Sequence, residues 1–292
     1  MKKILFLINP IAGNGLAPQL IRLLEQSSLS KKYEVTTQTT EYSGHASTLA
    51  ASAVQQGFDG VIAVGGDGTV NEVASQLVNT STALGIVPAG SGNGLARHLH
   101  YSGKYKTALE QLAFATVEKI DTLRINGRFS VNVSGFGFDG YVAYRFNKEG
   151  NRGISNYTKI ALKEYFKYPE IKFKIKVDNA AVEADAHMLV IANASQFGNA
   201  AIIAPTADLT DGQLDLVIVK RPPLLQMPST FYRLFTGKLK DNQHIKTYKC
   251  QQFIAEANRP VHLHIDGEAC EPLSVIDVKI IPKSLNVFLP KY

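Results

Sequence analysis

Short apolar runs alternate with helical patterns over roughly the first 120 residues of the chain. The runs ILFLI (4–8) and VIAV (61–64) are apolar at every position, whereas 18–26 and 45–56 have helical patterns. Strands that are apolar throughout are typical of parallel sheets covered by helices on both faces. The pattern predicts an α/β domain, and its N-terminal run is a first strand rather than a signal peptide.

From about Gly127 the periodicity changes to that of antiparallel strands. IKFKIKV (171–177) alternates strictly, Asp178 and Asn179 form a turn signal, and 181–193 is expected to return as its partner. Further strands are expected over 214–219, 247–257, 261–266 and 275–281, with helical insertions near 139–167 and 224–236. We expect an α/β domain over 1–124, a mostly antiparallel domain over 125–283, and a return of 284–292 to the first domain.

The composition is that of a globular protein whose charge favours an anionic partner. Hydrophobic residues make up 45% and charged residues 19% of the chain, and no run approaches the roughly 18 apolar residues of a membrane span. Cys250 and Cys270 form no metal-ligand cluster, so we expect free thiols in a reducing cytoplasm. A net charge of +6 and a pI near 9.1 fit a nucleotide, an anionic membrane surface or nucleic acid equally well.

Glycine-rich segments follow three predicted strands of the first domain. They are NPIAGNG (9–15), GGDGT (65–69) and PAGSGN (88–93). Ligands of parallel sheets bind beyond the carboxyl ends of the strands, and glycines at a helix N-terminus let backbone N–H groups approach phosphate. A carboxylate facing phosphates, that of Asp67, makes sense where a divalent cation lies between them. An isolated GGDG is more often a plain tight turn, but three such loops on one edge favour a phosphate site.

These motifs resemble the diacylglycerol kinase catalytic domain family, in its small bacterial form related to sphingosine and ceramide kinases. The resemblance covers nearly the whole chain through NPIAG (9–13), TEYSGHA (40–46), GGDGTVNEVA (65–74), VPAGSGNGLAR (87–97), GFGFDG (135–140), DGQLDLVIV (211–219) and IDGE (265–268). GGDGT alone is less specific, because NAD kinases and 6-phosphofructokinases look similar there. The resemblance implies an N-terminal nucleotide-binding domain, a C-terminal β-sandwich-like lipid-substrate domain, and ATP-dependent phosphorylation of a lipid hydroxyl in the cleft between them.

The resemblance also implies the site residues. The nucleotide positions carried over by motif are Asn9, Pro10, Gly13, Thr40, Gly65, Gly66, Asp67, Gly68, Thr69, Asn71, Glu72, Ser91 and Asn93. Asp67 would organise a catalytic Mg²⁺ and the phosphates, and Glu268 would be the general base for the acceptor hydroxyl, with Asp266 in support. Two residues apart on a strand end, Asp266 and Glu268 are expected to project the same way. An isolated DGE would more often be a solvated turn.

A second, structural Mg²⁺ is implied in the DGQLDLVIV segment. Relatives hold it with Asp211 as a side-chain ligand and carbonyls at the positions of Asp208 and Gln213, while a plain turn capped by Asp211 is the alternative. The chain departs from many bacterial diacylglycerol kinases at Gly94, where those enzymes have an aspartate after the asparagine. GSGNGLA is closer to sphingosine and ceramide kinases, so the acceptor stays open.

We therefore expect an ATP- and Mg²⁺-dependent lipid kinase acting on diacylglycerol, with a sphingoid base or another long-chain alcohol as the alternative acceptor. The rivals are a soluble-metabolite kinase of the NAD kinase type and a catalytically silent lipid- or nucleotide-binding protein. Residues 141–168 and 224–240 mix aromatic and basic side chains, which predicts transient peripheral membrane contact of a cytoplasmic protein unless the aromatics are core. No recognition motif supports nucleic-acid binding, and a homodimer is one option for the oligomeric state.

Overall fold

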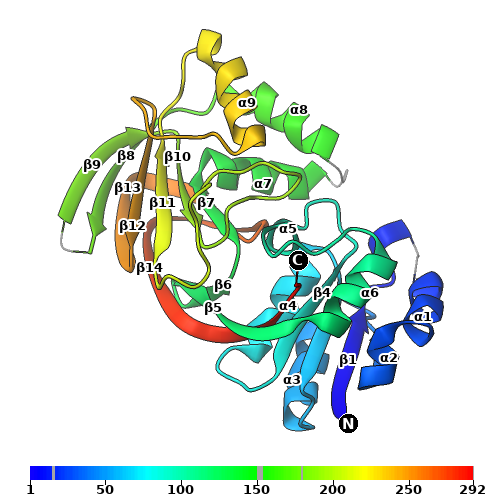
Figure 1. Cartoon of the computed structure of the whole chain (residues 1–292). Coiled ribbons are helices and arrows are strands. Elements are labelled where there is room, and N and C mark those ends of the chain that lie inside the picture. The colour runs from blue at the N-terminus through cyan, green and yellow to red at the C-terminus, as the bar shows by residue number, and fades with distance from the viewer. Residues whose placement is uncertain (15–16, 150–153, 179, 292) are drawn as a thin grey trace. The chain divides into compact units, whose positions relative to one another are not determined.

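The computed structural model describes residues 1–14, 17–149, 154–178 and 180–291 (Figure 1). The chain divides into two compact units, residues 1–120 with 283–292 and residues 121–282. The first unit is α/β with parallel strands, and the second is built on antiparallel strands. The predicted fold class is confirmed. None of the described helices is long and apolar enough to cross a membrane.

The first unit contains a parallel sheet in the order β4-β3-β1-β2, and the C-terminal part of β14 joins it beside β4. Its strands are β1 (Lys2–Ile8), β2 (Tyr33–Thr39), β3 (Gly60–Gly65), β4 (Ala83–Pro88) and the last residues of β14 (Glu268–Leu289). Its helices are η1 (Ala12–Asn14), α1 (Ala17–Glu25), α2 (Ser28–Lys32), α3 (His45–Gln55), α4 (Asp67–Leu77), α5 (Gly94–His98) and α6 (Tyr105–Phe114).

Helices cover both faces of this sheet, which explains why β3 and β4 are buried at every position. Helix α3 packs on α4 on one face, and α1, α2 and α6 pack together on the other (Figure 1). Helix α4 buries Val70, Val73, Ala74 and Leu77, which follow the spacing of one helical face. The carboxyl ends of β1, β3 and β4 consequently meet at one edge of the sheet.

The C-terminal segment is anchored in the first unit. Val287 lies opposite Leu84 of β4 in parallel register. The Phe288 ring fits over Gly60, where an added Cβ would lie 2.6 Å from the ring. The buried Tyr101 hydroxyl donates a hydrogen bond to the Phe288 carbonyl, and burial raises the pKa of this phenol. The last strand therefore closes the sheet beside β4.

The second unit has the antiparallel strand order β12-β11-β10-β7-β13-β14, with β8 and β9 added beside β13, and β5 and β6 beside β14. Its strands are the second half of β5 (Thr116–Ile125), β6 (Arg128–Ser130), β7 (Val133–Gly137), β8 (Ile171–Val177), β9 (Ala180–Ala186), β10 (Met188–Ala192), β11 (Leu214–Val219), β12 (Ile245–Cys250), β13 (Gln252–Ile265) and most of β14. Its helices are α7 (Phe138–Glu149), α8 (Ile154–Tyr165), η2 (Leu224–Gln226) and α9 (Met227–Thr236).

Two predicted strands of this unit are interrupted. The stretch 181–193 breaks at His187, so that β9 pairs with β8 while β10 pairs with β7 and β11. The stretch 247–257 breaks at Gln251, between β12 and β13. The alternation of β8 is as predicted, with apolar residues buried and lysines exposed. In the predicted turn, Asp178 has a φ of 46°, and Asn179 lies outside the described residues.

Candidate active site

The loops after β3 and β4 are joined by the carboxylate of Asp67. Helix α4 begins at Asp67 directly after the glycines, which leaves backbone N–H groups of its first turn without helical acceptors. Asp67 Oδ2 accepts a hydrogen bond from the Asn93 N–H (2.8 Å), and Oδ1 accepts one from the Gly94 N–H (2.7 Å). The half-buried carboxylate thus ties both loops together and offers the oxygen ligands that Mg²⁺ prefers.

Close backbone approach explains the glycines of these loops. A Cβ added at Gly90 would lie 2.5 Å from the Gly66 Cα, and one at Gly92 would lie 2.7 Å from Asp67 Oδ2. By contrast, an added Cβ at Gly68 meets nothing within 4 Å. Some of the glycines are therefore needed to pack the loops on each other. Gly68 leaves open space at the start of α4, where a phosphate can approach the backbone.

Asn9 joins the loop after β1 to the same edge. Its backbone N–H donates to the Val64 carbonyl (2.9 Å), and its Nδ2 donates to Thr69 Oγ1 (3.2 Å). Asn9 Oδ1 also accepts from the Ile11 N–H (3.2 Å) and so shapes its own turn. Gly13 has a φ of 60°, in the left-handed region that favours glycine. Three loops that are distant in sequence are thus bonded into one edge.

Two of the predicted nucleotide residues, Asn93 and Glu72, use their side chains to hold protein backbone. Asn93 has a φ of 54°, and its amide both donates to the Gly90 carbonyl (2.6 Å) and accepts from the Gly90 N–H (3.0 Å). The Glu72 carboxylate accepts from the N–H groups of Gly44 (3.0 Å) and Ala46 (3.1 Å) at the start of α3. Both residues shape the loops around the predicted site.

The remaining predicted nucleotide positions lie on the same unit with different exposure. Thr40 is buried at the end of β2, and its N–H donates to the Ile8 carbonyl (2.9 Å). Thr69 is buried, and an added Cβ at Gly65 would lie 2.5 Å from its Oγ1. Pro10 and Ser91 are exposed, and Asn71 is half-buried on α4.

The predicted shared orientation of Asp266 and Glu268 is wrong. Ile265 pairs directly with Glu268, so Asp266 and Gly267 form a two-residue hairpin turn with φ values of 48° and 92°. Because the turn reverses the chain, Asp266 is buried while Glu268 is exposed. The Asp266 carboxylate accepts from Ser130 Oγ (2.7 Å) and from the Val131 N–H (2.9 Å), and so anchors the turn.

The GFGFDG motif supplies a buried cluster to which sequence reasoning assigned no role. Asp139, in the first turn of α7, accepts hydrogen bonds from Tyr157 Oη (2.9 Å) and from His264 Nε2 (2.7 Å). The glycines on each side make room for it. An added Cβ would lie 2.2 Å from Asp139 Oδ2 at Gly135, and 2.3 Å from the backbone of β13 at Gly140. The one signal in the sequence that could have indicated this cluster is an aspartate flanked by glycines at a strand-to-helix junction.

Burial and charge act in opposite directions on this cluster. Burial works to raise the pKa of Asp139, but the charge and hydrogen bond of His264 and the hydrogen bond of Tyr157 hold it below its ordinary value. Burial works to lower the pKa of His264, and Asp139 raises it above its ordinary value. Burial and the Asp139 charge raise the pKa of Tyr157 well above its ordinary value, so its hydroxyl remains a donor at neutral pH.

Two family descriptions match the chain, "Diacylglycerol kinase catalytic domain" over residues 3–125 and "YegS C-terminal NAD kinase beta sandwich-like domain" over residues 132–289. The chain belongs to the diacylglycerol kinase family of lipid kinases. The resemblance seen in the motifs is thereby confirmed.

Individual relatives agree with this membership. The chain is 27% identical to a diacylglycerol kinase of Mycobacterium tuberculosis over 298 residues, which cover 99% of this chain and 96% of that protein. It is 25% identical to a diacylglycerol kinase of Bacillus subtilis, with 92% and 90% covered. A crystal structure of a diacylglycerol kinase from Bacillus anthracis shares the fold, with a TM-score of 0.78 at 20% identity over 99% of this chain and 97% of that one.

In this lipid kinase a lysine stands where the structural Mg²⁺ was expected. Lys249 Nζ lies 2.8 Å from Asp211 Oδ2 and 3.4 Å from Asp215 Oδ2. Asp211 Oδ1 accepts from the Gln213 N–H (2.9 Å), and the Asp208 carboxylate accepts from its own loop. The Asp211 carboxylate is therefore paired with an ammonium in this structure, and the structural Mg²⁺ stays a prediction.

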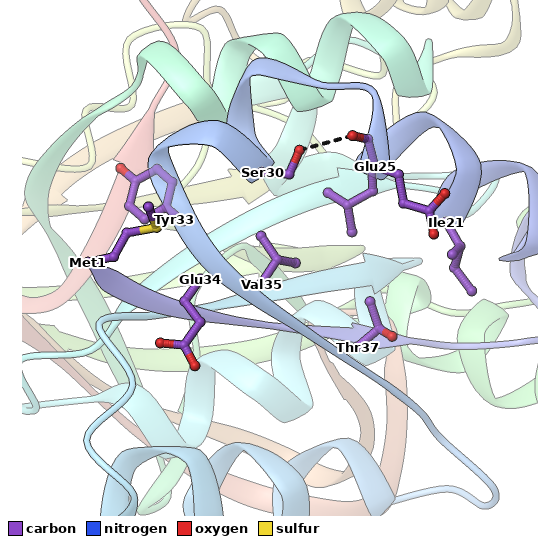
Figure 2. Close-up of a pocket in the computed structure, with 9 residues that line it drawn as sticks. Met1, Ile21, Glu25, Ser30, Tyr33, Glu34, Val35 and Thr37 are labelled. Carbon is purple, nitrogen blue, oxygen red and sulfur yellow. Dashed lines mark hydrogen bonds between the residues drawn. The ribbon is translucent and has the colours of Figure 1, made fainter.

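A groove of about 540 Å³ lies beside α1 and β2, which pairs only with β1 among the described strands (Figure 2). It is lined by Met1, Ile21, Leu24, Glu25, Ser30, Tyr33, Glu34, Val35 and Thr37. Met1 and Tyr33 lie where β1 and β2 begin, at the opposite end of the sheet from the glycine loops. The groove is not part of the kinase's candidate site.

Proposed function

We propose that the protein transfers the γ-phosphate of ATP to the hydroxyl of a lipid, with diacylglycerol as acceptor and phosphatidic acid as product. The observation that carries the proposal is the glycine-lined edge at which Asp67 joins two loops at the N-terminus of α4. Phosphoryl transfer needs mostly positioning of the phosphates and neutralisation of their charge. This edge offers backbone donors, a helix dipole and a carboxylate for both purposes.

Each unit has a distinct proposed task. In the first, the backbone of Gly66, Gly68 and Thr69 holds phosphates, with Asn9 and Thr40 among the surrounding nucleotide positions. A Mg²⁺ ion held by Asp67 supplies charge neutralisation when bound. In the second, Glu268 is exposed at the start of β14 and accepts the proton of the acceptor hydroxyl as the new bond forms.

Diacylglycerol is the proposed acceptor because the relatives are named diacylglycerol kinases. One residue of this chain favours a second candidate acceptor. Gly94, where many bacterial relatives carry an aspartate, donates its N–H to Asp67 Oδ1 at the start of α5. An acidic side chain is therefore missing from this loop. A sphingoid base or another long-chain alcohol is the alternative acceptor.

Two helical segments of the second unit expose the side chains of a membrane-contacting surface. Helix α8 and the turn that follows it expose Leu162 (50%) and Phe166 (57%) between three exposed lysines, here called the α8 lysines: Lys159 and Lys163 on the helix and Lys167 just after it. The segment η2–α9 exposes Leu225, Tyr232 and Phe235 together with Arg233. Apolar side chains beside cations suit an anionic bilayer surface. We propose transient peripheral contact of a cytoplasmic protein through these helices.

The test is phosphate transfer from labelled ATP with Mg²⁺, run in parallel on mixed-micelle diacylglycerol, sphingosine, monoacylglycerol and NAD. Glu268→Gln should abolish labelling, while Glu271→Gln, an exposed acid three residues along β14, should not. Labelled diacylglycerol supports the proposal, and labelled sphingosine alone moves the assignment to the second acceptor. Labelled NAD without labelled lipid would establish a metabolite kinase. ATP binding without any labelled product would indicate a silent binding protein.

A further inference from the structure

The turn that carries the proposed base is held from inside the second unit by a carboxylate–histidine pair. We infer that Asp139 and His264 are positioning residues that fix the Asp266–Gly267 turn, and through it the carboxylate of Glu268. The inference rests on the proposed role of Glu268 and assigns neither residue a contact with lipid or nucleotide. It gives a task to GFGFDG, a motif that the nucleotide edge does not use.

Both ring nitrogens of His264 have hydrogen-bond partners. In the neutral imidazole, Nδ1 accepts from the Gly267 N–H (3.1 Å), and the ring proton on Nε2 is donated to Asp139 Oδ2 (2.7 Å). The imidazole therefore links a buried carboxylate directly to the backbone of the turn. A carboxylate that receives the other ring N–H sets both the tautomer and the orientation of a histidine.

The cluster is built to keep this arrangement rigid. His264 is only 3% exposed, and Asp139 also receives the Tyr157 hydroxyl from α8 (2.9 Å). An added Cβ at Gly135 would collide with both Asp139 and His264, so the sequence leaves space for their hydrogen bond. Buried polar networks whose members are satisfied restrict the groups they contain to one geometry. The pair can thus transmit a defined position to the turn.

The turn needs such support because Glu268 itself is exposed. Asp266 is held through the Ser130 hydroxyl and the Val131 N–H, and Gly267 is held through His264. Each of the two turn residues thus has its own anchor, and Glu268 follows directly. A misplacement of a reacting group by about 1 Å can lower a rate by about 100-fold. Loss of the His264 anchor is therefore expected to reduce turnover without touching the nucleotide loops.

Two amide substitutions separate the two hydrogen bonds of His264. In His264→Asn the side-chain oxygen takes the place of Nδ1, which keeps an acceptor for Gly267. In His264→Gln the amide reaches the place of Nε2, which keeps a partner for Asp139 and removes that acceptor. His262→Gln, two residues earlier on β13, is the matched control. We expect His264→Gln to lower kcat for lipid phosphorylation about 10- to 100-fold. His264→Asn, which keeps the acceptor for Gly267 but loses the bond to Asp139, should recover part of it, and the KM for ATP should stay unchanged.

A second measurement does not depend on activity. Amide hydrogen exchange of Gly267, followed by NMR in protein labelled with ¹⁵N-glycine, should speed up in His264→Gln and stay slow in His264→Asn and His262→Gln. Unchanged Gly267 protection in His264→Gln would overturn the positioning role. The positioning role would also be overturned if both His264 variants lost the same share of kcat and these losses followed only their lowered melting temperatures. Normal Gly267 behaviour in a wild-type protein that labels no lipid would instead count against the proposed function.

Discussion

The buried histidine at the break between β9 and β10 makes stability depend on pH in a defined direction. His187 is 2% exposed, and neither ring nitrogen has a hydrogen-bond partner among the described residues. The ring stacks on Phe138 at 4.5 Å between centroids, with the ring of Tyr165 at 5.0 Å. Burial, and after it the positive charge of Arg221, lowers the pKa of His187 to about 3.

The sign and size of the effect follow from proton linkage. Below its ordinary pKa of about 6.5 the unfolded histidine binds a proton that the folded one does not take up. The stability is therefore fully present above pH 6.5 and is lost as the pH falls toward the folded pKa. At about 1.4 kcal/mol per pH unit, the 1.5 units between 6.5 and 5 cost about 2 kcal/mol. This figure is insensitive to the folded pKa because pH 5 lies about two units above it.

Urea unfolding of wild-type protein and of His187→Leu at pH 7 and pH 5 measures this contribution. Between the two pH values the wild type should lose about 2 kcal/mol more unfolding free energy than the variant. His100→Asn is the control, because His100 is exposed and has a φ of 61°, which asparagine tolerates. The unfolding free energy of His100→Asn should change between pH 7 and pH 5 by the same amount as that of the wild type. Equal pH dependence in the wild type and His187→Leu would refute the assigned state of His187.

Three further predictions concern the loops, the lysine and the membrane surface. Gly90→Ala should cost about 1–3 kcal/mol of stability and weaken ATP binding, whereas Gly68→Ala should weaken ATP binding with the melting temperature unchanged. Lys249→Met should cost about 1–3 kcal/mol and make the melting temperature rise with added Mg²⁺. The melting temperature of the wild type should not change when EDTA is added. A large decrease with EDTA would instead support the predicted Mg²⁺ site at Asp211. Changing the α8 lysines to glutamate should weaken the free energy of binding to anionic vesicles, measured by sedimentation, by at least about 3 kcal/mol, about 1 kcal/mol for each lost lysine. The same changes at the exposed lysines of β8 are the control, and equal losses would contradict a specific surface.

Much of the fold followed from local patterns. The wholly apolar runs of β1 and β3 indicated a covered parallel sheet, and the alternation of β8 indicated a strand with one exposed face. Parallel strands end at a common edge, so the glycine loops could be placed together before their contacts were known. The strand break at His187 could not be predicted, because it depends on which neighbours β9 and β10 select.

The site residues show a different limit. Asp266 and Glu268 are two residues apart, yet the left-handed turn between β13 and β14 points them differently. Periodicity describes a regular strand and therefore fails where the chain reverses. From their motifs, the side chains of Asn93 and Glu72 were expected to lie at the nucleotide. In the structure, the Asn93 amide accepts a hydrogen bond from the Gly90 backbone, and the Glu72 carboxylate accepts one from the Gly44 backbone.

By itself, the sequence determined the family, the fold class and the edge at which the glycine loops gather, because these depend on motifs and on local periodicity. Only the tertiary structure decided that Lys249 neutralises Asp211 and that His264 joins Asp139 to the Gly267 backbone. These partners lie 38 residues apart in the first pair and 125 between Asp139 and His264. Which distant side chain meets a carboxylate depends on the packing of whole strands and helices, and no local pattern records that choice.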